Sequence, residues 1–119
     1  LHGRPLAERG APRWIATVRE RVEVEYAAPP TLAELGRMVG RDAAYVAATF
    51  RRVYGDSVGA YVRQQRLWQA RRRMDAEPEA SLSEVALGCG YADQSHFTRQ
   101  FKRLFALTPA EYRRRQGSA

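Results

Sequence analysis

The segment from position 94 to 105 combines hydrogen-bonding side chains with a regular set of apolar ones. The apolar residues follow a helical stripe, so we expect them to form one buried face; they are Phe97, Phe101, Leu104 and Phe105. The opposite face then carries donors and acceptors outward, from Gln94, Ser95, His96, Thr98, Arg99 and Lys102. Arginine suits guanine, an amide suits adenine, and hydroxyls suit either base. This face is predicted to contact base edges.

The charge balance points to the same kind of partner. Among 119 residues there are 20 basic and 13 acidic side chains, giving a net charge of +7. Nine arginines but only two acids fall between positions 37 and 73, whereas acids cluster at 20–25 and 75–84. Such a surplus favours a polyanion, with nucleic acid the first choice and an anionic membrane surface the second.

The residue patterns that catalysis or metal binding would require are missing from the sequence. The sequence has no Ser/His/Asp or Cys/His set, no phosphate loop and no metal-ligand spacing, so neither an enzyme nor a cofactor or metal site is predicted. Besides His96 the only histidine is His2. The single cysteine, Cys89, excludes an internal disulfide framework, fits a reducing cytoplasm and is expected to pack in a turn. No apolar run is long enough to span a membrane.

Helical periodicity and cap residues predict an all-α fold with about seven helices. Their expected ranges are 13–27, 31–38, 42–54, 57–76, 81–88, 93–105 and 109–116. Capping boxes are predicted at Thr31/Glu34, Ser81/Glu84 and Thr108/Glu111, and N-caps at Asp42 and Ser57. Glycines 40, 55 and 90 stand where helices should end. Trp14, Trp68 and Tyr112 lie on apolar stripes and are expected in the core.

An internal repeat relates the two halves of the chain. Leu32, Glu34 and Gly40 recur 50 positions later as Leu82, Glu84 and Gly90, and Phe50 and Tyr61 recur 51 positions later as Phe101 and Tyr112. Each copy has a short helix, a tight glycine turn and a second helix, which is the arrangement of a helix-turn-helix. The second helices, 42–54 and 93–105, would enter the major groove. On the first, the outward residues are Ala44, Tyr45, Ala47 and Ala48.

The residues GYADQSHFTRQFKRLFALTPAEYRR, at 90–114, closely resemble the signature of AraC/XylS-type bacterial transcription regulators. Phe50-Arg51-Arg52 and the stretch from Gly55 to Tyr61 resemble the family's first helix-turn-helix, and Arg66-Leu67-Trp68-Gln69-Ala70 resembles its linker helix. The resemblance covers about 31–115. It implies a two-subdomain unit that binds DNA, with a regulatory domain usually placed before it.

The predicted 57–76 helix has a length suited to that arrangement. Twenty residues of α-helix extend ~30 Å, and successive major-groove faces of B-DNA lie ~34 Å apart. We therefore expect a leader at 1–12, subdomains at 13–56 and 77–119, and a linker helix at 57–76. Phosphate contacts are expected from Arg41, Arg51, Arg52, Lys102 and the amide ends of the helices beginning at Ser57 and Thr108.

The sequence departs from the family pattern in three ways. Alanines at 44, 47 and 48 can touch only a thymine methyl or allow close approach. Ala106 replaces the usual glycine after a recognition helix, so a left-handed residue there would cost about 1 kcal/mol. Gly36 replaces a small alanine and should weaken its helix by about as much.

Some alternatives stay open on the sequence. The arginines at 71–73 serve either as cations near a helix C-terminus or as phosphate contacts. A basic protein-interaction module, docking for example on RNA polymerase, is the second reading, and a non-specific RNA binder is the third. Because the chain begins at Leu1, we expect a fragment, monomeric by itself, of a cytoplasmic protein that dimerises through a preceding domain.

Overall fold

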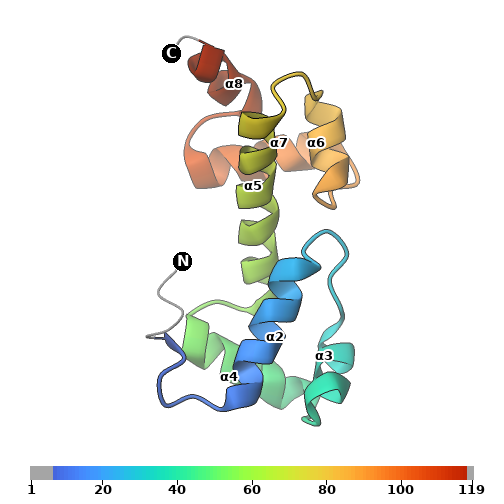
Figure 1. Ribbon diagram of the computed structural model, residues 1–119, viewed down its shortest axis with the longest axis vertical. Coiled ribbons are helices and arrows are strands. Elements are labelled where there is room, and N and C mark those ends of the chain that lie inside the picture. Colours follow the sequence, from blue (N-terminus) through green and yellow to red (C-terminus); the bar gives the residue numbers. More distant parts are fainter. Residues whose placement is uncertain (1–6, 118–119) are drawn as a thin grey trace. The chain divides into compact units, whose positions relative to one another are not determined.

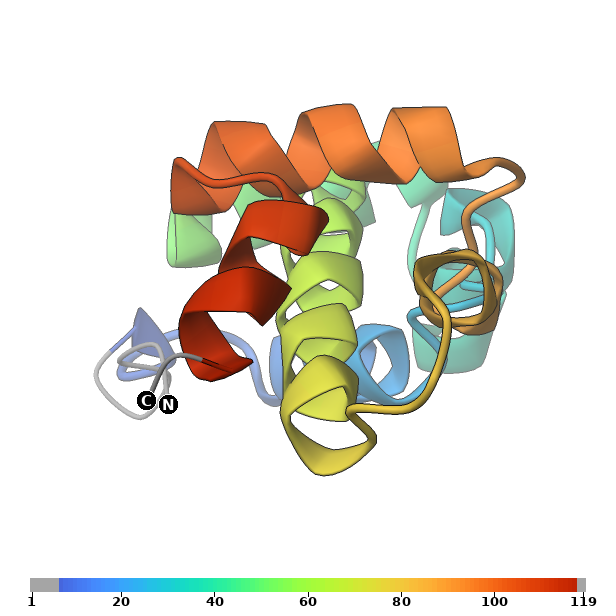
Figure 2. The ribbon, with the colours of Figure 1, turned by 90° about the horizontal axis from the view of Figure 1, so that it is seen from above.

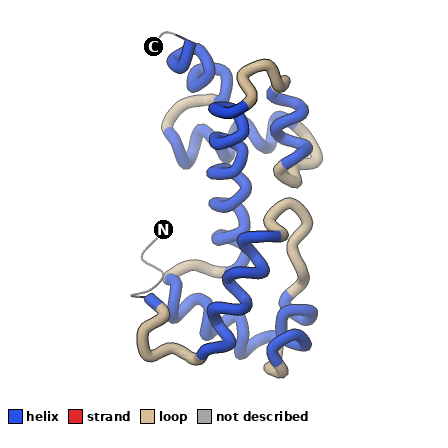
Figure 3. Tube along the Cα trace, in the orientation of Figure 1, coloured by secondary structure: helices blue, strands red, loops and turns tan. Residues whose placement is uncertain are grey.

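The computed structural model describes residues 7–117, and every regular element in that span is an α-helix (Figure 3). The helices are α2 (Arg13–Val24), α3 (Leu32–Val39), α4 (Ala43–Tyr54), α5 (Val58–Ala76), α6 (Leu82–Gly88), α7 (Gln94–Phe105) and α8 (Pro109–Gly117) (Figure 1). The predicted all-α class and its seven helices are confirmed within this span. None of these helices is long and apolar enough to cross a membrane.

The first helix ends earlier than predicted, at Val24 instead of position 27. Residues 25–28 form a turn, in which the Ala28 amide donates to the Glu25 carbonyl at 3.1 Å. Ala28 precedes Pro29, and a residue before proline is disfavoured in the helical conformation because the proline ring crowds its backbone. This restriction keeps Ala28 out of the helix, and residues 25–27 connect Val24 to it as a turn.

The chain divides into two compact units, one up to Val62 and one from Arg63, with the boundary inside α5. In the first unit α2, α3, α4 and the start of α5 enclose a core made of Ile15, Val18, Val22, Leu35, Val46, Phe50, Val58, Tyr61 and Val62. The members on α2 recur at helical spacing, as the sequence predicts. Trp14 is partly buried and packs against this core.

In the second unit α7 lies across the α5 segment of that unit (Figure 2). Its buried residues include Leu67, Ala70, Met74, Val85, Ala86, Cys89, Tyr91, Phe97, Phe101 and Pro109. Cys89 packs in the turn after α6, as predicted, and burial raises the pKa of its thiol.

Two residues expected in this core lie outside it. Leu104 is 41% exposed and Trp68 is 39% exposed. Trp68 meets the half-buried Phe105 edge-on, with ring centroids 5.0 Å apart, at the margin of the core. The apolar stripe of α7 is therefore wider than the surface that its neighbours cover. Tyr112 is half-buried.

The two copies of the repeat share one turn geometry. After α3, Gly40 has φ 68°, its amide donates to Arg37, and the Arg41 amide donates to the Gly36 carbonyl at 2.9 Å. After α6, Gly90 has φ 100°, with matching bonds from Gly90 to Leu87 and from Tyr91 to Ala86. Both turns are Schellman motifs, in which a left-handed residue lets two amides reach back to the last helical carbonyls.

Most predicted caps are present. Thr31/Glu34 and Thr108/Glu111 form reciprocal capping boxes, and Asp42 and Ser57 accept from the amides that follow them. The predicted box at Ser81/Glu84 is only half formed. The Ser81 hydroxyl accepts from the Glu84 amide at 3.0 Å, but no bond returns from the Glu84 carboxylate to the Ser81 amide. The expected left-handed alanine is confirmed, since Ala106 has φ 66°.

Gly36 has a different role from the one the sequence suggests. A Cβ at this position would lie 2.4 Å from the Arg41 carbonyl oxygen, closer than two such atoms can approach. The glycine therefore lets the turn fold closely over α3, and an alanine would not simply strengthen the helix. At the equivalent position of the second copy, Ala86 shows that the other turn has room for a methyl group.

The described part of the predicted leader is packed against the first unit. The Glu8 carboxylate lies 2.6 Å from Nε of Arg19 and accepts from the Tyr54 hydroxyl. Arg19 also pairs with Glu23 at 3.1 Å. Burial opposes the charge of Arg19, but bonds to Glu8 and Tyr54 and the nearby carboxylates more than offset it, so the pKa of its guanidinium is raised. Residues 1–6 of the leader, including His2, lie outside the described residues.

Candidate nucleic-acid interface

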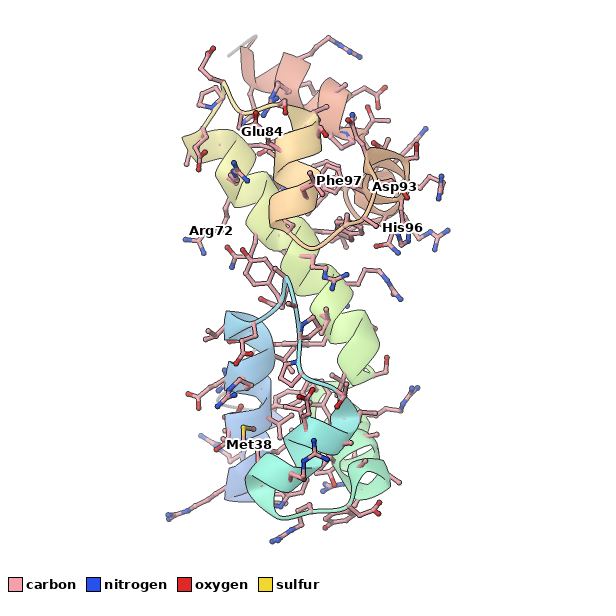
Figure 4. All side chains as sticks on the ribbon, turned by 90° about the vertical axis from the view of Figure 1, so that its right-hand side faces the viewer. Met38, Arg72, Glu84, Asp93, His96 and Phe97 are labelled. Carbon is pink, nitrogen blue, oxygen red and sulfur yellow. The ribbon has the colours of Figure 1, made fainter. Side chains whose placement is uncertain are left out.

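The start of α7 presents polar side chains from a fixed backbone. The Asp93 carboxylate accepts from the His96 amide at 2.8 Å and so caps the helix. Phe97 is fully buried on the side of α7 toward α6, whereas His96 is exposed (Figure 4). Of the predicted base-contact residues on α7, Gln94, Ser95, His96 and Arg99 are exposed and Thr98 is half-buried. The outward face predicted from the stripe is therefore present.

The corresponding face of α4 has few polar atoms. Asp42 caps this helix through the amides of Ala44 and Tyr45, and Val46 and Phe50 are fully buried. Ala44 and Ala48 are exposed, Ala47 is half-buried and Tyr45 is 51% exposed. Helices α4 and α7 thus hold equivalent places in the two copies of the repeat but expose different side chains. The α4 face has mainly methyl groups, and the α7 face has hydrogen-bonding groups.

An aromatic and cationic cluster, not foreseen from the sequence, borders the α4 face. The Trp14 ring lies 5.7 Å from the Tyr45 ring, and the Arg41 guanidinium lies 5.8 Å from the Trp14 centroid. Arg41 also donates to the Gly40 carbonyl at 3.2 Å. Cation–π and ring contacts limit the motion of these side chains, so Tyr45 and Arg41 are partly oriented before any partner arrives.

The predicted phosphate contacts differ in exposure. Arg41, Arg51, Arg52 and Lys102 are exposed, and Ser57 and Thr108 are half-buried. The Thr108 hydroxyl accepts from the Glu111 amide, while the Glu111 carboxylate accepts from the Thr108 amide. A carboxylate therefore already occupies part of the N-terminus of α8, which reduces the positive field there.

The arginine run near the end of α5 splits into separate roles. Arg71 donates to the Tyr112 hydroxyl at 3.0 Å, and its guanidinium lies 4.9 Å from the Tyr112 ring and 5.1 Å from the Phe105 ring. Arg73 bonds to Glu77 and to the Glu84 carbonyl. Arg72 is exposed (Figure 4). Arg71 and Arg73 thus join α5 to its neighbours, and Arg72 remains open to a partner.

Comparison with known proteins agrees with this geometry. Residues 35–115 match the family described as a helix-turn-helix domain. The chain is 31% identical over 101 residues to the regulatory protein SoxS of Salmonella typhimurium, covering 85% of this chain and 94% of SoxS. A solved structure, a probable AraC family transcriptional regulator from Rhodopseudomonas palustris, superposes with a TM-score of 0.78 at 26% identity, covering 87% of this chain and 97% of that one. This chain belongs to the AraC/XylS family.

A second relative is much longer than this chain. The chain is 33% identical over 104 residues to the HTH-type transcriptional regulator GlxA of Rhizobium meliloti, covering 87% of this chain but only 32% of GlxA. The chain therefore spans about a third of that relative and nearly all of SoxS. Within the AraC/XylS signature, the aromatic positions Tyr91, Phe97 and Phe101 are buried, while Ser95 and Arg99 are exposed. The signature joins core and surface residues of one helix-turn-helix.

Proposed function

We propose that this chain is the sequence-specific, double-stranded DNA-binding unit of a bacterial transcription regulator, with α4 and α7 entering successive major grooves. The observation that carries the proposal is the α7 face. It combines exposed Gln94, Ser95, His96 and Arg99 on a capped helix that follows a Schellman turn. These groups suit the donor and acceptor pattern of the major groove.

The contacts divide into two classes. Base edges would be contacted by Gln94, Ser95, His96, Thr98 and Arg99 in one half-site and by Ala44, Tyr45, Ala47 and Ala48 in the other. Phosphates would be bound by Arg41, Arg51, Arg52, Lys102 and the helix ends at Ser57 and Thr108. The whole protein would act in the cytoplasm and dimerise through a further domain. It would contact RNA polymerase while bound to DNA.

The first experiment selects bound duplexes from random DNA and then measures affinity for the selected site across salt concentrations. With some 5–8 phosphate contacts, log affinity should fall by roughly 4–7 for each tenfold increase in salt. A slope near zero, or equal binding to every duplex, would instead favour a protein-interaction module. Competition with single-stranded RNA tests the non-specific RNA reading.

The second experiment separates base contact from bulk charge. Arg99→Ala should weaken binding to the selected site by about five- to 150-fold, the loss of one bidentate base contact. Arg21→Ala removes the same charge from α2, where Arg21 pairs with Glu25 at 3.1 Å, and should have a much smaller effect. Equal losses in the two variants would assign Arg99 to electrostatic attraction alone.

A further inference from the structure

Tyr91, which precedes α7, and His96 and Gln100 on α7 are joined by two consecutive hydrogen bonds, and we call this chain of side chains the relay. The Tyr91 hydroxyl lies 2.6 Å from Oε1 of Gln100, and Nε2 of Gln100 lies 3.0 Å from Nε2 of His96. The Tyr91 and His96 rings also meet edge-on, with centroids 5.4 Å apart. Tyr91 is 3% exposed, so the relay begins in the core and ends at an exposed residue of the recognition helix.

The chemistry of the three groups sets the direction of each bond. An amide oxygen only accepts, so Tyr91 donates to Gln100; an amide nitrogen only donates, so Nε2 of His96 accepts. A neutral imidazole has one hydrogen, which must then sit on Nδ1. Burial raises the pKa of Tyr91 in spite of the nearby Arg66 and Arg63, so its hydroxyl keeps its proton.

The opposite amide orientation is disfavoured by the core. Rotating the Gln100 amide would turn its NH₂ group toward Tyr91 and its oxygen toward His96. Among the described residues Gln100 is the hydrogen-bond partner of the Tyr91 hydroxyl, so the rotated form leaves a buried hydroxyl hydrogen without an acceptor. Such a group is costly to bury unpaired.

We propose that Tyr91 and Gln100 are positioning residues for specificity, and that they hold His96 as the Nδ1–H tautomer so that it acts as a donor toward DNA. A donor selects base-edge acceptors, such as guanine O6, a purine N7 or thymine O4, over the amino groups of cytosine and adenine. The DNA part of this inference rests on the proposed function. The tautomer itself is a property of the free protein.

The tautomer is measured by long-range ¹H–¹⁵N correlation on the uniformly ¹⁵N-labelled chain, at a pH high enough that the ring nitrogen shifts are those of a neutral imidazole. A His2→Gln variant assigns the two histidines. We expect a pyrrole-like Nδ1 and a pyridine-like Nε2 for His96. The Nε2–H form in the wild-type protein would overturn the inference, whatever the protein does with DNA.

Two variants test the relay. Gln100→Glu offers oxygens to both neighbours, so the hydrogen of His96 should move to Nε2. Tyr91→Phe removes the donor that orients Gln100, so the Nδ1–H population should fall. Tyr61→Phe, which removes a buried hydroxyl bonded to Glu23, is the matched control and should leave His96 unchanged. A His96 tautomer insensitive to both relay variants would refute the positioning role.

The DNA measurement uses the selected site with each base substituted in turn at the pair nearest His96. Wild type should prefer an acceptor by about two- to tenfold, the range of one neutral hydrogen bond. Tyr91→Phe should reduce this preference at that pair only, His96→Ala should do the same, and Tyr61→Phe should keep it. If the tautomer is as expected but no base preference changes, His96 does not read DNA through this donor.

Discussion

At the scale of single residues, Ala106 is strained and its counterpart in the repeat is not. Ala106 has φ 66° after α7, and Gly55 has φ 83° after α4. Ala106→Gly should raise the free energy of unfolding by about 1 kcal/mol, because glycine adopts the left-handed conformation without a Cβ penalty. Gly55→Ala should lower it by a similar amount, because alanine is strained at this positive φ; a Cβ there meets no atom within 4 Å, so no steric clash adds to the cost. Urea unfolding of both variants checks the two signs.

A substitution at Gly36 tests steric crowding between α3 and the turn that follows it, and not backbone strain. Gly36→Ala should destabilise the first unit by about 1–2 kcal/mol, because crowding against the Arg41 carbonyl outweighs the gain in helix propensity. Gly59→Ala is the matched control: this helical glycine has only the Ser57 hydroxyl nearby, at 4.0 Å, and should gain up to about 1 kcal/mol. Thermal unfolding compares them. A stabilised Gly36→Ala protein would mean that the turn moves away easily.

At the scale of elements, the two complete capping boxes predict a response to acid. The bond from the Thr31 amide lowers the pKa of Glu34, and the bond from the Thr108 amide lowers that of Glu111. Each carboxylate stabilises the fold above the unfolded pKa, near 4.5, and this stabilisation is lost as pH falls through the lowered folded pKa. In the Glu34→Gln/Glu111→Gln variant, unfolding free energy should fall less steeply with acid. An unchanged acid response would contradict the prediction.

The segment before α2 is expected to contribute to the stability of the first unit. Glu8→Ala should destabilise it by about 1–3 kcal/mol, because Arg19 and the Tyr54 hydroxyl lose a partly buried partner. Arg9→Ala, one residue along in the same segment, is the control and should change stability by less than about 0.5 kcal/mol. Urea unfolding measures both. Similar values for the two would show that the Glu8 contacts add nothing to stability.

At the scale of the whole molecule, the two recognition helices predict unequal half-sites. The α7 face offers donors and acceptors, whereas the α4 face offers mainly methyl groups beside Tyr45. Base substitutions in the α7 half-site should therefore cost ~1–3 kcal/mol at a contacted pair, and those in the α4 half-site less. The latter should depend more on phosphate contacts and DNA shape. A base-pair scan at one salt concentration tests this; an equally intolerant α4 half-site would implicate Tyr45 or Arg41 as base readers.

Features that depend on neighbours in sequence follow from the sequence alone. The periodicity of α2, the boxes at Thr31 and Thr108, and the left-handed Ala106 all involve residues within about one helical turn, where spacing fixes geometry. The repeat adds the turn at Gly90 from its likeness to the turn at Gly40. These local rules were enough to predict the all-α class and the outward face of α7.

What the tertiary structure decides depends on residues far apart in sequence. Glu8 meets Tyr54, 46 positions away, and Arg71 meets Tyr112, 41 positions away. A stripe shows which side of a helix is apolar but not how far its neighbours extend over it, so Leu104 is exposed although the sequence placed it in the core. His96 depends on the fold at shorter range: Gln100 is four positions along α7 and Tyr91 is nine positions before Gln100, but only the packing of the second unit buries Tyr91. The residue type of His96 shows that it can donate or accept, and the buried Tyr91 hydroxyl, acting through Gln100, selects between the two because a buried polar hydrogen requires an acceptor.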